Sequence, residues 1–277
     1  MNWNENRQVR IALLDLYEGK ENQGMRCIRE IVHQWGQANQ LEYVLDEFDV
    51  RQNLAVPGLN YDIYISSGGP GSPLESIGSD WENKYYEWLQ NVEAWNNDVS
   101  KENKKYVFFI CHSFQMACRY YNAGNVCKRK STAFGIFPIH MMQGAKGEPV
   151  FEGLKDPFYA VDSRDFQVIE PNHAQLKKLG AKILAIEKER PHVPYERAVM
   201  AIRFSDYFIG TQFHPEADPT GMSMYLNRED KMQTVIENYG REKWQNMIDN
   251  LNDPRKITLT YQNILPNFLN QAVAVLA

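Results

Sequence analysis

The cysteine in the segment FICHSFQ (109–115) stands where a nucleophile could be mounted. Cys111 follows the apolar run YVFFI (106–110), which predicts a buried strand, and it precedes a segment with the pattern of a helix. A strand that runs straight into a helix forces a tight turn, and the helix N-terminus favours the thiolate form of a cysteine there. Cysteine is also a common small apolar residue in protein interiors, so the segment alone leaves an ordinary buried thiol as the alternative.

A histidine and a glutamate close another expected strand in the segment GTQFHPE (210–216). His214 and Glu216 are two residues apart, so in an extended chain their side chains point to the same face. A carboxylate beside an imidazole orients the ring and stabilises its protonated form, and the imidazole can then take a proton from a nearby thiol. Taken alone, the same pattern also fits a surface histidine and glutamate in a turn.

The glycine-rich segment SSGGPGS (66–72) follows a third expected strand. Neighbouring glycines allow backbone conformations that aim amide hydrogens into a cleft, where they can bind an oxyanion. The alternatives are a flexible turn or a phosphate-binding loop. The phosphate loop is disfavoured because its pattern needs a lysine followed by serine or threonine, which are missing here.

The elements between these segments predict how they are positioned. Strand-like apolar runs alternate with amphipathic helical stretches up to about residue 125, which is typical of an open, mostly parallel sheet with helices on both faces. Function in such sheets lies at the carboxyl ends of the strands, where the three segments fall. Residues 125–216 predict added antiparallel strands, and residues from 221 onward predict helices. We therefore expect one domain over 1–277, with a core at about 8–220 and a helical extension at about 221–277.

The three segments, in this order, resemble the signature segments of class I glutamine amidotransferases over roughly residues 8–220. The resemblance implies a flavodoxin-like fold and a Cys-His-Glu triad of Cys111 as nucleophile, His214 as base and Glu216 as its orienter. It also implies an oxyanion hole made of two backbone amides and a pocket for glutamine. The expected amides are those of Gly69 and His112, and the expected substrate contacts are Gln115, Gly68 and Ser113.

Two regions depart from the pattern of that family. The family usually has glycine two residues before and two residues after the nucleophile, where this chain has Phe109 and Ser113. The bulky Phe109 implies either a different helix packing or a remodelled pocket. The segment VDSRD (161–165) replaces a region where the family tends to place a histidine, and Arg164 within it is expected to form a surface ion pair rather than to hold a substrate carboxylate.

The leading functional hypothesis is a glutaminase-type thiol amidohydrolase that releases ammonia through a γ-glutamyl thioester. No cofactor or metal is expected, and a separate synthetase subunit is a candidate partner for the ammonia. The first alternative is a hydrolase of γ-glutamyl peptides or γ-glutamyl amines with the same triad. The second is a catalytically silent binding protein that keeps the fold.

Composition limits the partners. The formal net charge is -5, from 30 basic and 35 acidic side chains, and the basic cluster CKRKS (127–131) is expected in a solvated helix end or loop. An acidic chain without a basic face is a poor candidate for nucleic-acid binding. No apolar stretch approaches the length of a membrane span, and the four cysteines are too few for a disulfide scaffold. We expect a cytoplasmic protein, with homo-oligomerisation left open.

Overall fold

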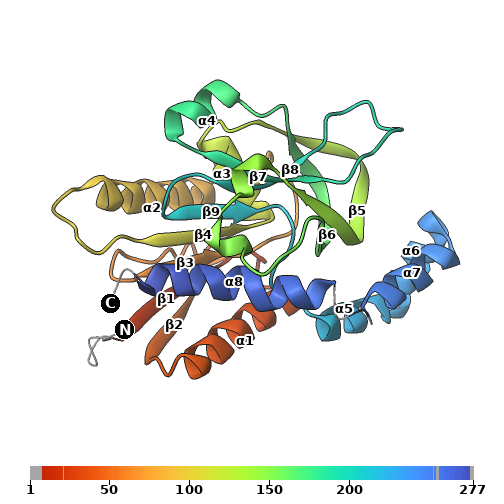
Figure 1. The fold of residues 1–277 in the computed structure, drawn as a ribbon, viewed down its shortest axis with the longest axis horizontal. Helices are drawn as coiled ribbons and strands as arrows, with labels where there is room; N and C mark the ends of the chain where they lie inside the picture. Colours follow the sequence, from red (N-terminus) through yellow and green to blue (C-terminus); the bar gives the residue numbers. More distant parts are fainter. Residues whose placement is uncertain (1–7, 21, 252, 254–255, 275–277) are drawn as a thin grey trace.

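The computed structural model describes residues 8–20, 22–251, 253 and 256–274. A single mixed sheet runs through the molecule in the strand order β2-β1-β3-β4-β9-β8-β7-β5-β6 (Figure 1). Its strands are β1 (Val9–Asp15), β2 (Tyr43–Asp49), β3 (Ile63–Ser66), β4 (Tyr106–Ile110), β5 (Asn125–Met141), β6 (Phe158–Ile169), β7 (Lys182–Glu187), β8 (Val199–Arg203) and β9 (Phe208–Thr211).

The sheet has a parallel half and an antiparallel half. Strands β2, β1, β3, β4 and β9 pair in parallel, while β9 pairs with β8, β8 with β7, β7 with β5 and β5 with β6 in antiparallel fashion. Because the parallel strands share one direction, the segments that follow β3, β4 and β9 leave the sheet at the same edge. The predicted fold class is confirmed, and the added antiparallel strands lie where the sequence places them.

Helices cover both faces of the parallel half. The helices of the described residues are α1 (Gln23–Ala38), α2 (Asp80–Asn97), α3 (His112–Tyr120), α4 (His173–Leu179), α5 (Pro219–Leu226), α6 (Glu229–Tyr239), α7 (Arg241–Leu251) and α8 (Ile257–Ala274), with short 3₁₀ turns η1 (Gln143–Ala145) and η2 (Pro149–Phe151). Alternate residues of β1 divide between the two faces: Ile11 and Leu13 pack with α1 and α8, and Ala12 and Leu14 pack with α2 and α3. Burial on both faces explains why β1 reads as a continuous apolar run.

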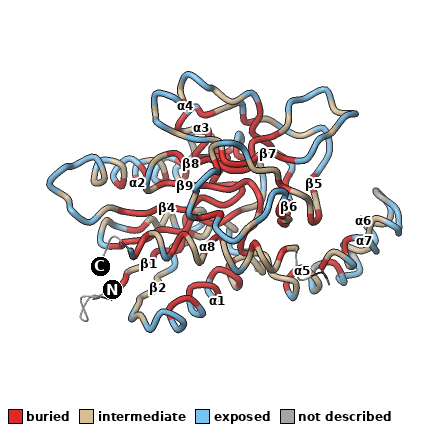
Figure 2. Tube along the Cα trace, in the orientation of Figure 1, coloured by how far each residue is buried: buried red, intermediate tan, exposed pale blue. Residues whose placement is uncertain are grey.

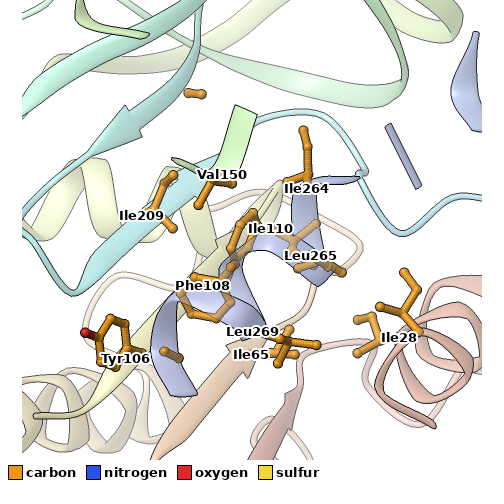
Figure 3. Packing of buried hydrophobic residues seen from close by; sticks show 14 of the residues in the cluster. Ile28, Ile65, Tyr106, Phe108, Ile110, Val150, Ile209, Ile264, Leu265 and Leu269 are labelled. Carbon is orange, nitrogen blue, oxygen red and sulfur yellow. The ribbon is translucent and has the colours of Figure 1, made fainter. Parts of the chain in front are cut away.

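The last helix, α8, belongs to the main core. Figure 3 shows Leu265 and Leu269 of α8 beside Phe108 and Ile110 of β4, and the rings of Phe108 and Phe268 have centroids 5.1 Å apart. Helix α8 therefore packs against β4, the strand that ends immediately before Cys111.

Helices α5, α6 and α7 form a smaller cluster away from that core. Met222, Leu226 and Met247 pack with Ile136 of β5 and Val161 of β6. In Figure 1, α6 and α7 extend from the body of the molecule, and Figure 2 shows much of their surface exposed. Among the described helices, none combines the length and apolar character that crossing a bilayer needs.

The basic cluster at 127–131 was wrongly expected in a loop or helix end. These residues lie in β5, and Cys127 and Lys128 pair with β6. The Arg129 guanidinium is largely buried and lies 3.2 Å from the Glu187 carboxylate. Lys128 and Lys130 are exposed, as expected of a solvated cluster, whereas the ion pair of Arg129 could not be predicted because Glu187 is distant in the chain.

Candidate functional site

Cys111 occupies a strained turn between β4 and α3. Its backbone has φ 49° and ψ -95°, a conformation that residues with a side chain rarely adopt. Two backbone hydrogen bonds hold the turn: the Cys111 amide donates to the Thr211 carbonyl of β9 at 2.7 Å, and the Gln115 amide donates to the Cys111 carbonyl at 3.0 Å. Cys111 is 5% exposed, so the sulfur lies just below the surface.

His214 and Glu216 follow β9 and form a close pair. The His214 Nδ1 and Glu216 Oε1 atoms are 2.8 Å apart, and Glu216 is fully buried. The His214 amide donates to the Val161 carbonyl at 2.8 Å, which fixes the backbone of this segment against β6. The His214 side chain retains 14% exposure, so the imidazole is the more accessible partner of the pair.

The surroundings of His214 favour its protonated form. Burial alone would lower the pKa of His214, but the negative charges of Glu216 and Cys111, together with hydrogen bonds to both side chains, outweigh burial and hold this pKa well above its ordinary value. The ring therefore has a carboxylate at its Nδ1 atom, and the charge of Cys111 adds to the rise of its pKa.

Gly68 marks the point where the three segments converge. A Cβ atom added to Gly68 would lie 3.0 Å from His214 Cε1 and 3.6 Å from Cys111 Cβ. The same point is 3.0 Å from the hydroxyl of Tyr17, which follows β1. Burial, together with the charges of Glu216 and Cys111, raises the pKa of Tyr17 well above its ordinary value. Tyr17 was not among the residues predicted for the site.

Two backbone amides in the converging segments have no hydrogen-bond acceptor among the described residues. Among the described residues, neither the Gly69 amide nor the His112 amide donates a hydrogen bond. The loop that carries Gly69 is tied to β1, because the Ser67 amide donates to the Leu14 carbonyl at 3.0 Å. A Cβ atom on Gly69 would lie 2.5 Å from the Leu16 carbonyl oxygen, so only glycine allows this close approach.

Gln115 is buried one turn along α3 and reaches Cys111 through another glutamine. Its side-chain amide donates to Gln212 Oε1 at 3.0 Å, and Gln212 Nε2 lies 3.6 Å from the Cys111 sulfur. Gln115 also donates to the Phe166 carbonyl of β6 at 3.3 Å. The structure therefore adds Gln212 to the surroundings of the sulfur, a residue that the sequence did not single out.

The sequence matches the family "Glutamine amidotransferase class-I" over residues 22–231, which is most of the chain. The chain belongs to the class I glutamine amidotransferase family. Domains of this family act on glutamine, and many are paired with synthetase domains. A search of curated proteins gave no match.

Solved structures share the fold of this chain at low sequence identity. A glutamine amidotransferase from Thermotoga maritima has a TM-score of 0.63 and 16% identity, and the alignment covers 97% of this chain and 99% of that one. The CTPS glutaminase domain of Trypanosoma brucei with bound acivicin has a TM-score of 0.57 and 16% identity, with 96% and 94% covered. A glutamine amidotransferase from Methylobacillus flagellatus has a TM-score of 0.59 and 13% identity, with 95% and 94% covered.

The departure from the family at Phe109 concerns packing. Phe109 is fully buried between β4 and the α2–α3 layer, and it pairs in register with Gly210 of β9. A Cβ atom on Gly210 would lie 3.1 Å from Phe109 Cβ and 2.8 Å from Phe114 Cδ2. Gly210 of β9 therefore leaves the room that the Phe109 side chain needs. In the family pattern, a glycine at the position of Phe109 would leave room there instead. Of the two expectations for Phe109, helix packing is the one that the structure supports.

Ser113 stabilises the turn between β4 and α3. Its hydroxyl accepts from the Ile110 amide at 2.8 Å and lies 2.8 Å from the Ser66 carbonyl, to which it donates. Ser113 is fully buried. These bonds place the hydroxyl behind Cys111 and join the ends of β3 and β4, which differs from the substrate contact expected for this side chain.

The expected ion pair of Arg164 with a neighbouring aspartate is present, but the expected surface location is wrong because both residues are buried. The Arg164 guanidinium lies 2.8 Å from Asp162 and 3.2 Å from Glu187. Glu187 is shared with Arg129 and Arg190, so the antiparallel half contains a buried ionic cluster. The guanidinium of Arg164 is therefore engaged by carboxylates of the protein itself.

A cavity of about 380 Å³ opens beside this ionic cluster, and its lining does not include Cys111, His214 or Glu216. Within the described residues, no group of three or more His, Cys, Asp or Glu side chains could hold a metal ion. The groups at the site itself are a thiol, an imidazole, a carboxylate and free amides, which are suited to acyl transfer.

Proposed function

We propose that this amidotransferase is a thiol amidohydrolase that cleaves the side-chain amide of glutamine and releases ammonia. The observation that carries the proposal is the His214–Glu216 pair, with its 2.8 Å contact, beside a cysteine held at a strained strand-to-helix turn. A thiol, a base and an orienting carboxylate from two distant segments form the constellation that nucleophilic acyl transfer needs.

The first half of the reaction forms a thioester. His214 takes the proton of Cys111, and the sulfur attacks the γ-carbonyl carbon of glutamine. The negative charge on the carbonyl oxygen is bound by the amides of Gly69 and His112. The tetrahedral intermediate collapses as the C–N bond breaks, and His214 returns the proton to the nitrogen, which leaves as ammonia.

The second half restores the enzyme. A water molecule loses a proton to His214 and attacks the γ-glutamyl thioester. The C–S bond breaks, the proton returns to the Cys111 sulfur, and glutamate leaves. Glu216 stays ionised in both halves, because its role is to orient the imidazole and stabilise the imidazolium.

The ammonia has two destinations in this proposal. It passes to a separate synthetase subunit, or it is released into solution. The structural likeness to a glutaminase domain that binds acivicin supports glutamine as the substrate. A cytoplasmic location, a homo-oligomeric state and a single-domain organisation over 1–277 stay predictions from the sequence.

A hydrolase of γ-glutamyl peptides or amines remains the second candidate. It was raised by Phe109, Ser113 and the VDSRD segment, which suggested a wider pocket. Phe109 packs in the core on the α2–α3 side of the sheet, the Ser113 hydroxyl donates to the Ser66 carbonyl, and Arg164 is held by carboxylates. Of these three features, only the VDSRD segment contacts the sulfur, through the Ser163 backbone carbonyl at 3.8 Å. These contacts favour glutamine.

The test is a substrate screen of the purified chain, measuring ammonia and glutamate release from L-glutamine, a γ-glutamyl dipeptide and L-asparagine. We expect turnover of glutamine that is lost in Cys111→Ala. Cys118→Ala is the matched control: this cysteine also lies on α3, but it is fully buried and burial raises its pKa well above the ordinary value. Turnover of the dipeptide alone would support the second candidate. An active Cys111→Ala variant would end both proposals.

A further inference from the structure

Arg51 joins the two segments that carry the free amides. It lies in the turn after β2. Its Nη1 donates to the Pro70 carbonyl at 2.8 Å, and its Nη2 lies 2.8 Å from His112 Nε2. Pro70 directly follows Gly69, so one guanidinium touches both sides of the expected oxyanion hole. We propose that Arg51 is a positioning residue that sets the separation of the Gly69 and His112 amides.

The contact with His112 defines the state of that ring. Arginine has only hydrogen-bond donors, so His112 Nε2 must be the acceptor and the ring must be neutral, with its proton on Nδ1. Burial, together with the charges of Arg51 and Arg119, lowers the pKa of His112 to about 3. The ring therefore stays neutral at ordinary pH, and protonation does not break the contact.

The guanidinium is held from a third side by an aromatic ring. The Arg51 Cζ atom lies 4.7 Å from the centroid of the Trp81 ring, which belongs to α2. Arg51 Nη2 is also 3.2 Å from the position that a Cβ atom on Gly69 would take, so the guanidinium lies directly against the loop. Planar stacking together with two directed donors is a geometry that lysine cannot reproduce.

The consequence for catalysis follows from the distance sensitivity of an oxyanion hole. The Gly69 amide lies on a loop after β3, and the His112 amide lies at the start of α3, so their spacing depends on a link between the two elements. Arg51 provides such a link without touching the sulfur or the His214–Glu216 pair. Displacing a reacting partner by about 1 Å can lower a rate about 10²-fold.

The test compares Arg51→Met and Arg51→Lys with Arg29→Met, a control at an exposed ion pair with Glu47. The turnover measurement rests on the proposed function. Two further readouts do not depend on it. The first is hydrogen exchange of the peptide spanning 66–72. The second is alkylation of Cys111 by iodoacetamide, in which the sulfur displaces iodide and no oxyanion forms.

For Arg51→Met we expect kcat to fall about 10²-fold with KM within about threefold. Exchange of the 66–72 peptide should become faster, and the alkylation rate should stay within about twofold. Arg51→Lys should recover less than a tenth of the lost kcat, because it keeps the charge but loses the planar fork. Arg29→Met should match the wild type in every readout.

Unchanged exchange of the 66–72 peptide in Arg51→Met would overturn the inference, whatever the activity. So would a parallel fall in turnover and alkylation, since that pattern means damage to the cysteine turn itself. If the wild type cleaves no amide, the proposed function fails. The exchange result then still decides whether Arg51 positions the loop.

Discussion

The parallel half of the sheet (β2, β1, β3, β4 and β9) and the antiparallel half (β8, β7, β5 and β6) both reach Cys111, but their interiors differ in kind. In the parallel half, apolar side chains fill both faces, and the groups at the strand ends are fixed through backbone hydrogen bonds. In the antiparallel half, a buried network of three arginines and two carboxylates holds β5, β6 and β7 together.

This difference assigns separate tasks to the two halves. The parallel half supplies the reacting groups, and its apolar interior gives them a rigid backbone. The antiparallel half approaches the sulfur through the Ser163 carbonyl and fixes the His214 backbone through Val161. Changes in the first half should therefore act on chemistry and strain, and changes in the second should act first on stability.

The largest expected effect is on chemistry, from Glu216→Gln. Turnover should fall about 10³–10⁴-fold, because the neutral amide neither fixes the ring orientation nor stabilises the imidazolium. The negative charge of Glu216 raises the pKa of His214, so its removal lowers that pKa. His214 must be protonated to release ammonia, so the alkaline limb of the kcat/KM profile should move to lower pH. An unmoved limb in the variant would show that His214 does not set it.

The next effect tests the ionic interior. Glu187→Gln leaves Arg129, Arg164 and Arg190 without their shared carboxylate, and the loss of one partner from a buried network costs about 3–5 kcal/mol. Urea unfolding measures this change. Glu189→Gln, at an exposed neighbouring position, is the control and should stay within about 0.5 kcal/mol of the wild type. Equal stability of the two variants would contradict the role of the network.

A smaller effect is expected from the apolar interior. Gly210→Ala places a methyl group 2.8 Å from Phe114 and 3.1 Å from Phe109, so overpacking should destabilise the protein by about 1–3 kcal/mol. Gly58→Ala, at an exposed glycine whose methyl group would meet only the flexible end of Asn60, should change stability little. Thermal unfolding distinguishes them. Unchanged stability of Gly210→Ala would mean that β4 and β9 can move apart enough to accommodate the methyl group.

The smallest effect concerns the strain at the cysteine. Glycine adopts positive φ without penalty, so Cys111→Gly should be more stable than Cys111→Ala by about 1 kcal/mol. At an ordinary strand end, where φ is negative, the alanine variant would be the more stable of the two. Chemical unfolding of the two inactive variants side by side gives the difference. A more stable alanine variant would show that the turn relaxes once the sulfur is absent.

The sequence alone was sufficient to predict which backbone segments come together at the site. Apolar runs predicted the strands, and the parallel rule predicted that the ends of β3, β4 and β9 share an edge. Cys111, the glycine loop and the His214–Glu216 pair could be brought together on that basis. These features depend on local pattern and on topology, which a sequence displays directly.

Contacts between side chains from distant segments could not be predicted in the same way. Arg51 meets His112 across 61 positions, and Arg129 meets Glu187 across 58. Neither pair has a periodic signal, so the first was overlooked and the second was hidden in an apparently solvated basic cluster. The direction of the Ser113 hydroxyl was also unpredictable, because a small residue at a turn can face either side.

The place of α8 has a consequence for how the protein is made. This helix, formed by residues 257–274, covers the strand that ends just before Cys111 (Figure 3). A growing polypeptide on the ribosome exposes β4 to water on that side until α8 has emerged. Cys111 is thus synthesised well before the helix that completes the core around the preceding strand.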